Sequence, residues 1–123
     1  MMKQQTLTKS EIQVMNILWK MGKGACVNDI LMQYPDPKPA YTTIATFLKI
    51  LTQKGFVEHR KGAGKLLVYT PLITKERYRR QVMNEVKDNF FDDSIKKMFR
   101  FFVQEEKLTA QDIQELLNMK EIV

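Results

Sequence analysis

The chain has 123 residues, 44% of them hydrophobic, which suits one domain or one small domain with an appendage. No apolar run approaches the roughly 20 residues that a membrane-spanning helix needs, and the first residues lack the apolar core of a signal peptide. We therefore expect a cytoplasmic protein with no direct membrane association. The single cysteine, Cys26, excludes an internal disulfide framework and a cysteine-cluster metal site, and we expect it to be a small buried hydrophobic residue.

The net charge of +6 is unevenly distributed. Residues 1–72 contain ten Lys and Arg against four Asp and Glu, whereas residues 73–123 contain ten of each kind. A polyanion would therefore be attracted to the first part of the chain and be indifferent to the rest. Because many soluble proteins are mildly basic, the charge alone leaves nucleic-acid binding open.

Three helices are predicted in the first half of the chain. Thr8 and Glu11 form a capping box that starts the first helix, whose apolar face carries Ile12, Met15, Leu18 and Trp19. Gly22 and Gly24 end it, and a short second helix has an apolar stripe of Val27, Ile30, Leu31 and Tyr34. Prolines 35, 37 and 39 break the chain before a third helix, which we expect from near Ala40 to Gly55.

Two β-rich runs follow, at residues 56–60 and 66–70, around the glycine-rich segment 61–65. Three helices and a hairpin are the order of a winged helix-turn-helix, so we predict a mainly α fold with a DNA-binding domain at residues 1–72. Three further helices are expected in a helical dimerisation domain at residues 73–123. Thr74 can cap the first of them, residues 92–94 interrupt the chain, and Thr109 with Asp112 starts the last.

The third predicted helix has two contrasting faces at 100° per residue. Tyr41, Ile44, Phe47, Leu48 and Leu51 lie on one side, and Thr42, Thr46, Lys49 and Gln53 lie on the other. The second set contains no carboxylate, which DNA phosphates would repel, and Thr and Gln can contact bases. The alternative is a chance lack of acidic residues over a few positions. The element order favours a helix that reads the major groove.

Arg60, Lys61 and Lys65 surround Gly62 and Gly64 in the predicted hairpin loop. The glycines let the backbone come close to DNA, and the cations can contact phosphate or a minor groove. A plain solvated turn is the alternative there. The candidate DNA-binding residues of helix and hairpin together are Lys38, Tyr41, Thr42, Thr43, Ala45, Thr46, Lys49, Gln53, Arg60, Lys61 and Lys65.

The C-terminal segment is rich in large apolar groups and short for an independent core. Phe101 and Phe102 are adjacent, so they point to different sides of a helix, and a second copy of the chain could cover both sides. Packing back onto the winged helix is the alternative. The candidate dimerisation residues are Tyr78, Val82, Val86, Phe90, Ile95, Met98, Phe99, Phe102, Val103, Ile113, Leu116 and Leu117.

The sequence offers little for catalysis, so we do not expect an enzyme, a metal site or a cofactor. His59 is the only histidine and is predicted on a strand as a partly exposed side chain. Asp92 and Asp93 fit a helix start better than a catalytic dyad.

These segments together resemble the penicillinase-repressor family, also called BlaI/MecI/CopY. The matching stretches are residues 7–11, 14–19, 43–48, 51–57, 64–65 and 68–71, with a looser match to Phe102-Val103 and Leu108-Thr109. The resemblance implies a homodimeric repressor on a palindromic double-stranded DNA operator, with the third helix in the major groove. It also implies, for the β-lactam branch, release through a membrane sensor protease pathway.

Three departures from the family pattern concern release and recognition. The Asn-Phe cleavage pair of the β-lactam branch aligns with Phe101-Phe102, and the Cys-x-Cys metal tail of the copper branch is missing. Relatives often carry Arg at the positions of Ala45 and Ile50, which implies a different operator or weaker binding here. The releasing signal is left open, as are two other functions of the same fold: a protein-interaction module and a ligand sensor.

Overall fold

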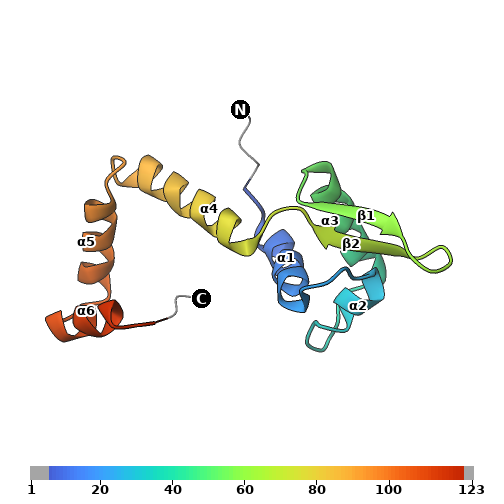
Figure 1. Cartoon of the computed structure of the whole chain (residues 1–123), viewed down its shortest axis with the longest axis horizontal. Helices are drawn as coiled ribbons and strands as arrows, with labels where there is room; N and C mark the ends of the chain where they lie inside the picture. The colour runs from blue at the N-terminus through green and yellow to red at the C-terminus, as the bar shows by residue number, and fades with distance from the viewer. Residues whose placement is uncertain (1–5, 121–123) are drawn as a thin grey trace. The chain divides into compact units, whose positions relative to one another are not determined.

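A computed structural model describes residues 6–120, and Figure 1 shows its elements in chain order. They are α1 (Lys9–Met21), α2 (Val27–Leu31), α3 (Tyr41–Gln53), β1 (Val57–Lys61), β2 (Leu67–Pro71), α4 (Lys75–Phe90), α5 (Ile95–Glu105) and α6 (Ala110–Leu117). The chain divides into two compact units, Met1–Arg79 and Arg80–Val123. No helix within residues 6–120 is long and apolar enough to cross a membrane.

The predicted caps of α1 are confirmed. The Glu11 amide donates to the Thr8 hydroxyl at 3.2 Å, and the Thr8 amide donates to the Glu11 carboxylate at 2.9 Å. Gly22 ends the helix with φ at 67°, a left-handed conformation that favours glycine. Both ends of α1 are therefore determined by local sequence.

The core of the first unit lies where α1, α2 and α3 meet the hairpin. Its largest fully buried side chains are Val14, Met15, Leu18, Ile30, Ile44, Leu48, Leu51, Phe56 and Val57. Cys26 is buried, as predicted. Tyr41 was expected on the buried side of α3, but it is 51% exposed, because it is the first residue of the helix and the buried positions begin at Ile44.

The hairpin pairs β1 with β2 in antiparallel register, with His59 opposite Tyr69 and Lys61 opposite Leu67. Each strand begins one residue later than predicted. The Ala25 and Tyr69 backbones also exchange two hydrogen bonds, at 2.8 and 3.0 Å, which join the turn before α2 to β2. Three helices and this hairpin form the predicted winged helix-turn-helix.

Tyr78 belongs to the core of the first unit, so its predicted place in a dimer contact is wrong. Its ring packs 5.5 Å from Phe56 and 6.1 Å from Trp19, measured between ring centroids. Its hydroxyl accepts a hydrogen bond from the Leu7 amide at 2.9 Å, and the residue is only 6% exposed. The first turns of α4 therefore complete the winged helix.

In the second unit, local capping interactions again determine where helices α5 and α6 begin. The Ser94 hydroxyl accepts from the Lys97 amide at 3.2 Å, and Thr109 and Asp112 form a capping box at the start of α6. Asp92 and Asp93 do not start a helix: both have positive φ in the turn before α5, where Lys87 pairs with Asp93 at 2.8 Å.

Candidate nucleic-acid interface

Helix α3 presents the polar face that the helical spacing predicts. Ile44, Leu48 and Leu51 are fully buried and fix the rotation of the helix. The outer stripe of α3, as we call this face, consists of the exposed residues Thr42, Thr46, Lys49 and Gln53. Because residues 37–57 contain no Asp or Glu, this stripe has no carboxylate of its own helix to repel a phosphate.

The hydroxyl of Thr46 is oriented by its own helix. Its Oγ1 donates to the Thr42 carbonyl at 2.8 Å. The hydroxyl proton is used in this hydrogen bond. The residue is exposed, so the oxygen lone pairs and the methyl group are available for a contact with DNA. Thr46 can therefore accept a hydrogen bond from a base or contact a thymine methyl.

The hairpin loop carries the second group of candidate residues and projects away from the three helices (Figure 1). Arg60, Lys61 and Lys65 are all exposed. Arg60 lies 3.4 Å from Glu58, an exposed pair that contributes little. Within residues 6–120, Lys61 and Lys65 have no carboxylate within ion-pair distance, so their charge is available to a phosphate.

Lys38 has a structural role instead. Its ammonium donates to the Tyr34 carbonyl at 2.6 Å and to the Met32 carbonyl at 3.4 Å, and it lies 3.8 Å from Asp36. These carbonyls follow the end of α2, so Lys38 closes the turn between α2 and α3. We therefore expect Lys38, which is exposed, to contribute less to DNA binding than the sequence predicts.

A hollow of about 260 Å³ brings the helix and the hairpin loop together. Tyr41 and Ala45 of α3 line it with Lys65 of the loop, and Asn28 of α2 lies at the same hollow. Tyr69 forms part of the wall of this hollow. Burial raises the pKa of its hydroxyl, and the electrostatic effect of the nearby Tyr41 raises it further by a smaller amount. Asn28 is exposed, and no local sequence signal indicates that it lies beside residues so far along the chain.

The candidate dimerisation residues divide by exposure. Met98 is only 7% exposed within its own chain, so its predicted contact with a partner is wrong. Phe90 is 77% exposed and Leu117 is 73% exposed, although both are large apolar side chains. Four others are also exposed: Ile95, Phe99, Phe102 and Leu116. The remaining four are partly exposed: Val82, Val86, Val103 and Ile113.

Comparison with known proteins gives the family. A family model described as "Penicillinase repressor" matches residues 7–121, nearly the whole chain. The chain belongs to the penicillinase repressor family. Among curated relatives of this family member, the penicillinase repressor of Bacillus licheniformis is 26% identical, with 94% of this chain and 89% of the relative covered. The methicillin resistance regulatory protein MecI of Staphylococcus aureus is 27% identical, with 92% and 91% covered.

Two solved structures of the repressor BlaI are similar to this penicillinase repressor family member. One is the monomeric form of Bacillus licheniformis BlaI in complex with the blaP half-operator, at 30% identity and a TM-score of 0.51. Another is the DNA-binding domain of the repressor BlaI, at 29% identity and a TM-score of 0.52. In each case the similarity covers 63% of this chain and 94% of the chain in the solved structure. The family is one of transcriptional repressors, and the winged helix is its DNA-binding fold.

Proposed function

We propose that this chain is a homodimeric transcriptional repressor that binds a palindromic operator, with α3 in the major groove and the hairpin loop on the backbone or minor groove. The observation that carries the proposal is the carboxylate-free outer stripe of α3, together with the exposed cations Lys61 and Lys65, which form no ion pair within residues 6–120. The BlaI domain bound to a half-operator, which has the same fold, supports it.

The exposed apolar side chains of the second unit support the dimer. Phe90, Phe99, Phe102 and Leu117 are too large and too numerous on short helices to be ordinary surface residues. A second copy of the same surface would cover them in an isologous contact. Two copies would also present two α3 helices, which matches the two half-sites of a palindrome.

The experiment that tests the repressor is DNA binding measured by fluorescence anisotropy. One labelled duplex contains the sequence upstream of the chain's own coding region, and the control duplex has the same composition in shuffled order. We expect tighter binding to the first, with an affinity that falls with salt by about 0.9 in the log–log slope for each phosphate contact.

Two results would contradict the proposal. Equal affinity for both duplexes would leave only non-specific binding and remove the operator. A complex with another protein that is insensitive to salt, without DNA affinity, would instead favour a winged helix used as a protein-interaction module.

A further inference from the structure

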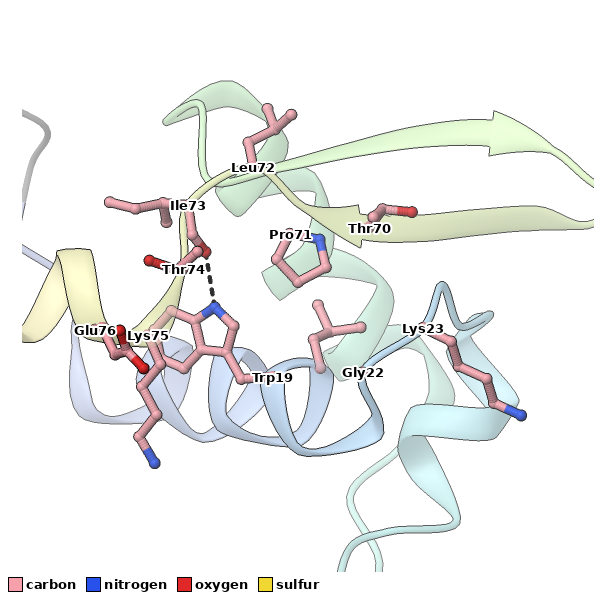
Figure 2. Close-up of a pocket in the computed structure, with 11 residues that line it drawn as sticks. Trp19, Gly22, Lys23, Thr70, Pro71, Leu72, Ile73, Thr74, Lys75 and Glu76 are labelled. Atoms are coloured by element: carbon pink, nitrogen blue, oxygen red, sulfur yellow. Dashed lines mark hydrogen bonds between the residues drawn. The ribbon is translucent and has the colours of Figure 1, made fainter. Parts of the chain in front are cut away.

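A cavity of about 450 Å³ lies in the first unit, away from the outer stripe of α3. Figure 2 shows its walls, with Trp19 of α1 on one side and Pro71 at the end of β2 on the other. The segment of Leu72, Ile73 and Thr74, which connects β2 to α4, closes a third side. Every lining residue belongs to the first compact unit.

The wall around Trp19 is held in place by hydrogen bonding. The indole Nε1–H donates to the Ile73 carbonyl at 2.8 Å, which fixes the ring plane against the connecting segment. Tyr78 packs on the same indole from within the core, at 6.1 Å between ring centroids. Gly22 also lines the cavity and contributes no side chain that could fill it. The indole wall of the cavity is therefore held in one orientation by its hydrogen bond and by ring packing.

The side chains that line the cavity favour a flat apolar ligand. Leu18, Trp19, Pro71 and Leu72 contribute apolar surface, and the indole offers a planar face. Cavities of roughly 300–1,000 Å³ with mainly apolar walls and a few polar groups are typical of small-molecule sites.

The charged side chains at the edge of the cavity favour an anionic ligand. Lys23 and Lys75 lie on either side of the hollow in Figure 2, and Glu76 is the one carboxylate among its lining residues. Within residues 6–120 neither Glu76 nor Lys75 forms an ion pair, so Lys75 is free to turn toward a ligand. Arg77 and Arg79 lie just beyond the lining residues in the same compact unit and add to the positive charge of this part of the chain.

We propose that this cavity binds a small organic anion with a flat apolar body, such as an aromatic carboxylate. The apolar part packs against Trp19 and Pro71, and the carboxylate is placed at the rim within reach of Lys23 or Lys75. The cavity is lined by none of the candidate DNA-binding or dimerisation residues, so ligand binding there is independent of the proposed repressor function.

The test is an NMR titration of the full chain with 2-naphthoate, and with 2-naphthalenemethanol as its uncharged analogue. Trp19 is the only tryptophan, so its indole N–H gives a single cross-peak of its kind. Naphthoate should move this cross-peak and the Gly22 amide to saturation. The alcohol should bind about fivefold more weakly, because exposed charge pairs contribute modestly.

Charge variants identify the anion site. The double variant Lys23→Glu/Lys75→Glu should bind the alcohol more tightly than the acid, because the two introduced carboxylates repel the ligand carboxylate that the lysines attract. Lys9→Glu is the matched control, since Lys9 is exposed on α1 and does not line the cavity, and it should keep the preference for the acid. Thermal unfolding and a dispersed spectrum check that each variant is folded.

Three outcomes would overturn the proposal. In the first, naphthoate does not bind at millimolar concentration. In the second, shifts appear only at amides of the second unit, which would place the ligand on its exposed phenylalanines. In the third, the double variant keeps its preference for the acid.

Discussion

Lys54 donates hydrogen bonds to both carboxylate oxygens of Glu11, at 2.8 and 3.1 Å, across 43 residues of sequence. Glu11 is 3% exposed and also accepts from the Thr8 amide, so one carboxylate closes the capping box of α1 and holds the residue that follows α3. The start of α1 and the end of the proposed DNA-reading helix are thereby joined by a buried ion pair.

Removing one partner of this pair should destabilise the fold strongly. Glu11→Gln leaves the Lys54 ammonium largely buried without its counter-charge, and we expect a loss of about 3 kcal/mol in the free energy of unfolding. Urea denaturation measures it. The control is Glu58→Gln in the exposed pair with Arg60, which should cost less than about 1 kcal/mol. Equal losses in the two variants would contradict a special role for Glu11.

The same carboxylate predicts a pH dependence. Burial raises the pKa of Glu11, but hydrogen bonds from Lys54 and Thr8 lower it by more, so the pKa lies below its usual 4.5. An acid with a depressed folded-state pKa stabilises the protein above its unfolded pKa and loses this contribution as the pH falls through the folded value. The stability difference between the wild type and Glu11→Gln should therefore be constant near neutral pH and shrink below pH 4.5 in urea denaturation. A difference that grew toward acid would refute this assignment.

Thr46→Ala should relax base specificity at one operator position. The substitution removes the oxygen that the Thr42 carbonyl orients, and we expect a loss of about 1–3 kcal/mol of discrimination at that position. Anisotropy with duplexes substituted one base pair at a time measures it. Alanine favours helix, so the free energy of unfolding should not fall. Uniform weakening on all duplexes would show that Thr46 does not read a base.

Lys65→Ala should weaken binding to every duplex to the same extent, because a phosphate contact carries no sequence information. The slope of log affinity against log salt should decrease by about 1. Lys38→Ala is the matched control: its ammonium is bonded to backbone carbonyls, so the slope should stay unchanged. If Lys38→Ala reduced the slope as Lys65→Ala does, Lys38 would contact a phosphate in addition to the backbone carbonyls.

Phe102→Asp should convert the proposed dimer to monomers of 14.5 kDa in light scattering at micromolar concentration. A charge buried without a partner at the contact costs several kcal/mol. Phe102 is 44% exposed within one chain, so the variant should keep its helical content. A wild-type protein that is already monomeric would refute the dimer.

The helix ends could be predicted because their signals are local. The Thr8–Glu11 capping box, the Thr109–Asp112 box and the left-handed Gly55, with φ at 83°, each depend on neighbours a few residues away. The exposed face of α3 follows from helical spacing alone. These features account for most of the fold and for the outer stripe.

What the sequence could not predict depends on contacts between distant residues. The apolar spacing of α4 indicates that Tyr78 is buried but not against which partner, and the partners are Trp19 and Phe56. The place of Asn28 at the interface likewise depends on how Tyr41 and Lys65 approach α2. Contacts of this kind depend on how the helices and the hairpin pack together, and local sequence patterns do not predict that packing.

The bridge between Ala25 and Tyr69 also affects how copies of the chain can associate. Because β2 pairs with β1 on one side and with Ala25 on the other, β1 forms the outer edge of the sheet. That edge carries Glu58, Arg60 and Lys61, and charged side chains on an edge strand oppose the addition of another strand. Concentrated protein is therefore protected against growth of a continuous sheet from the hairpin of one copy to the hairpin of the next.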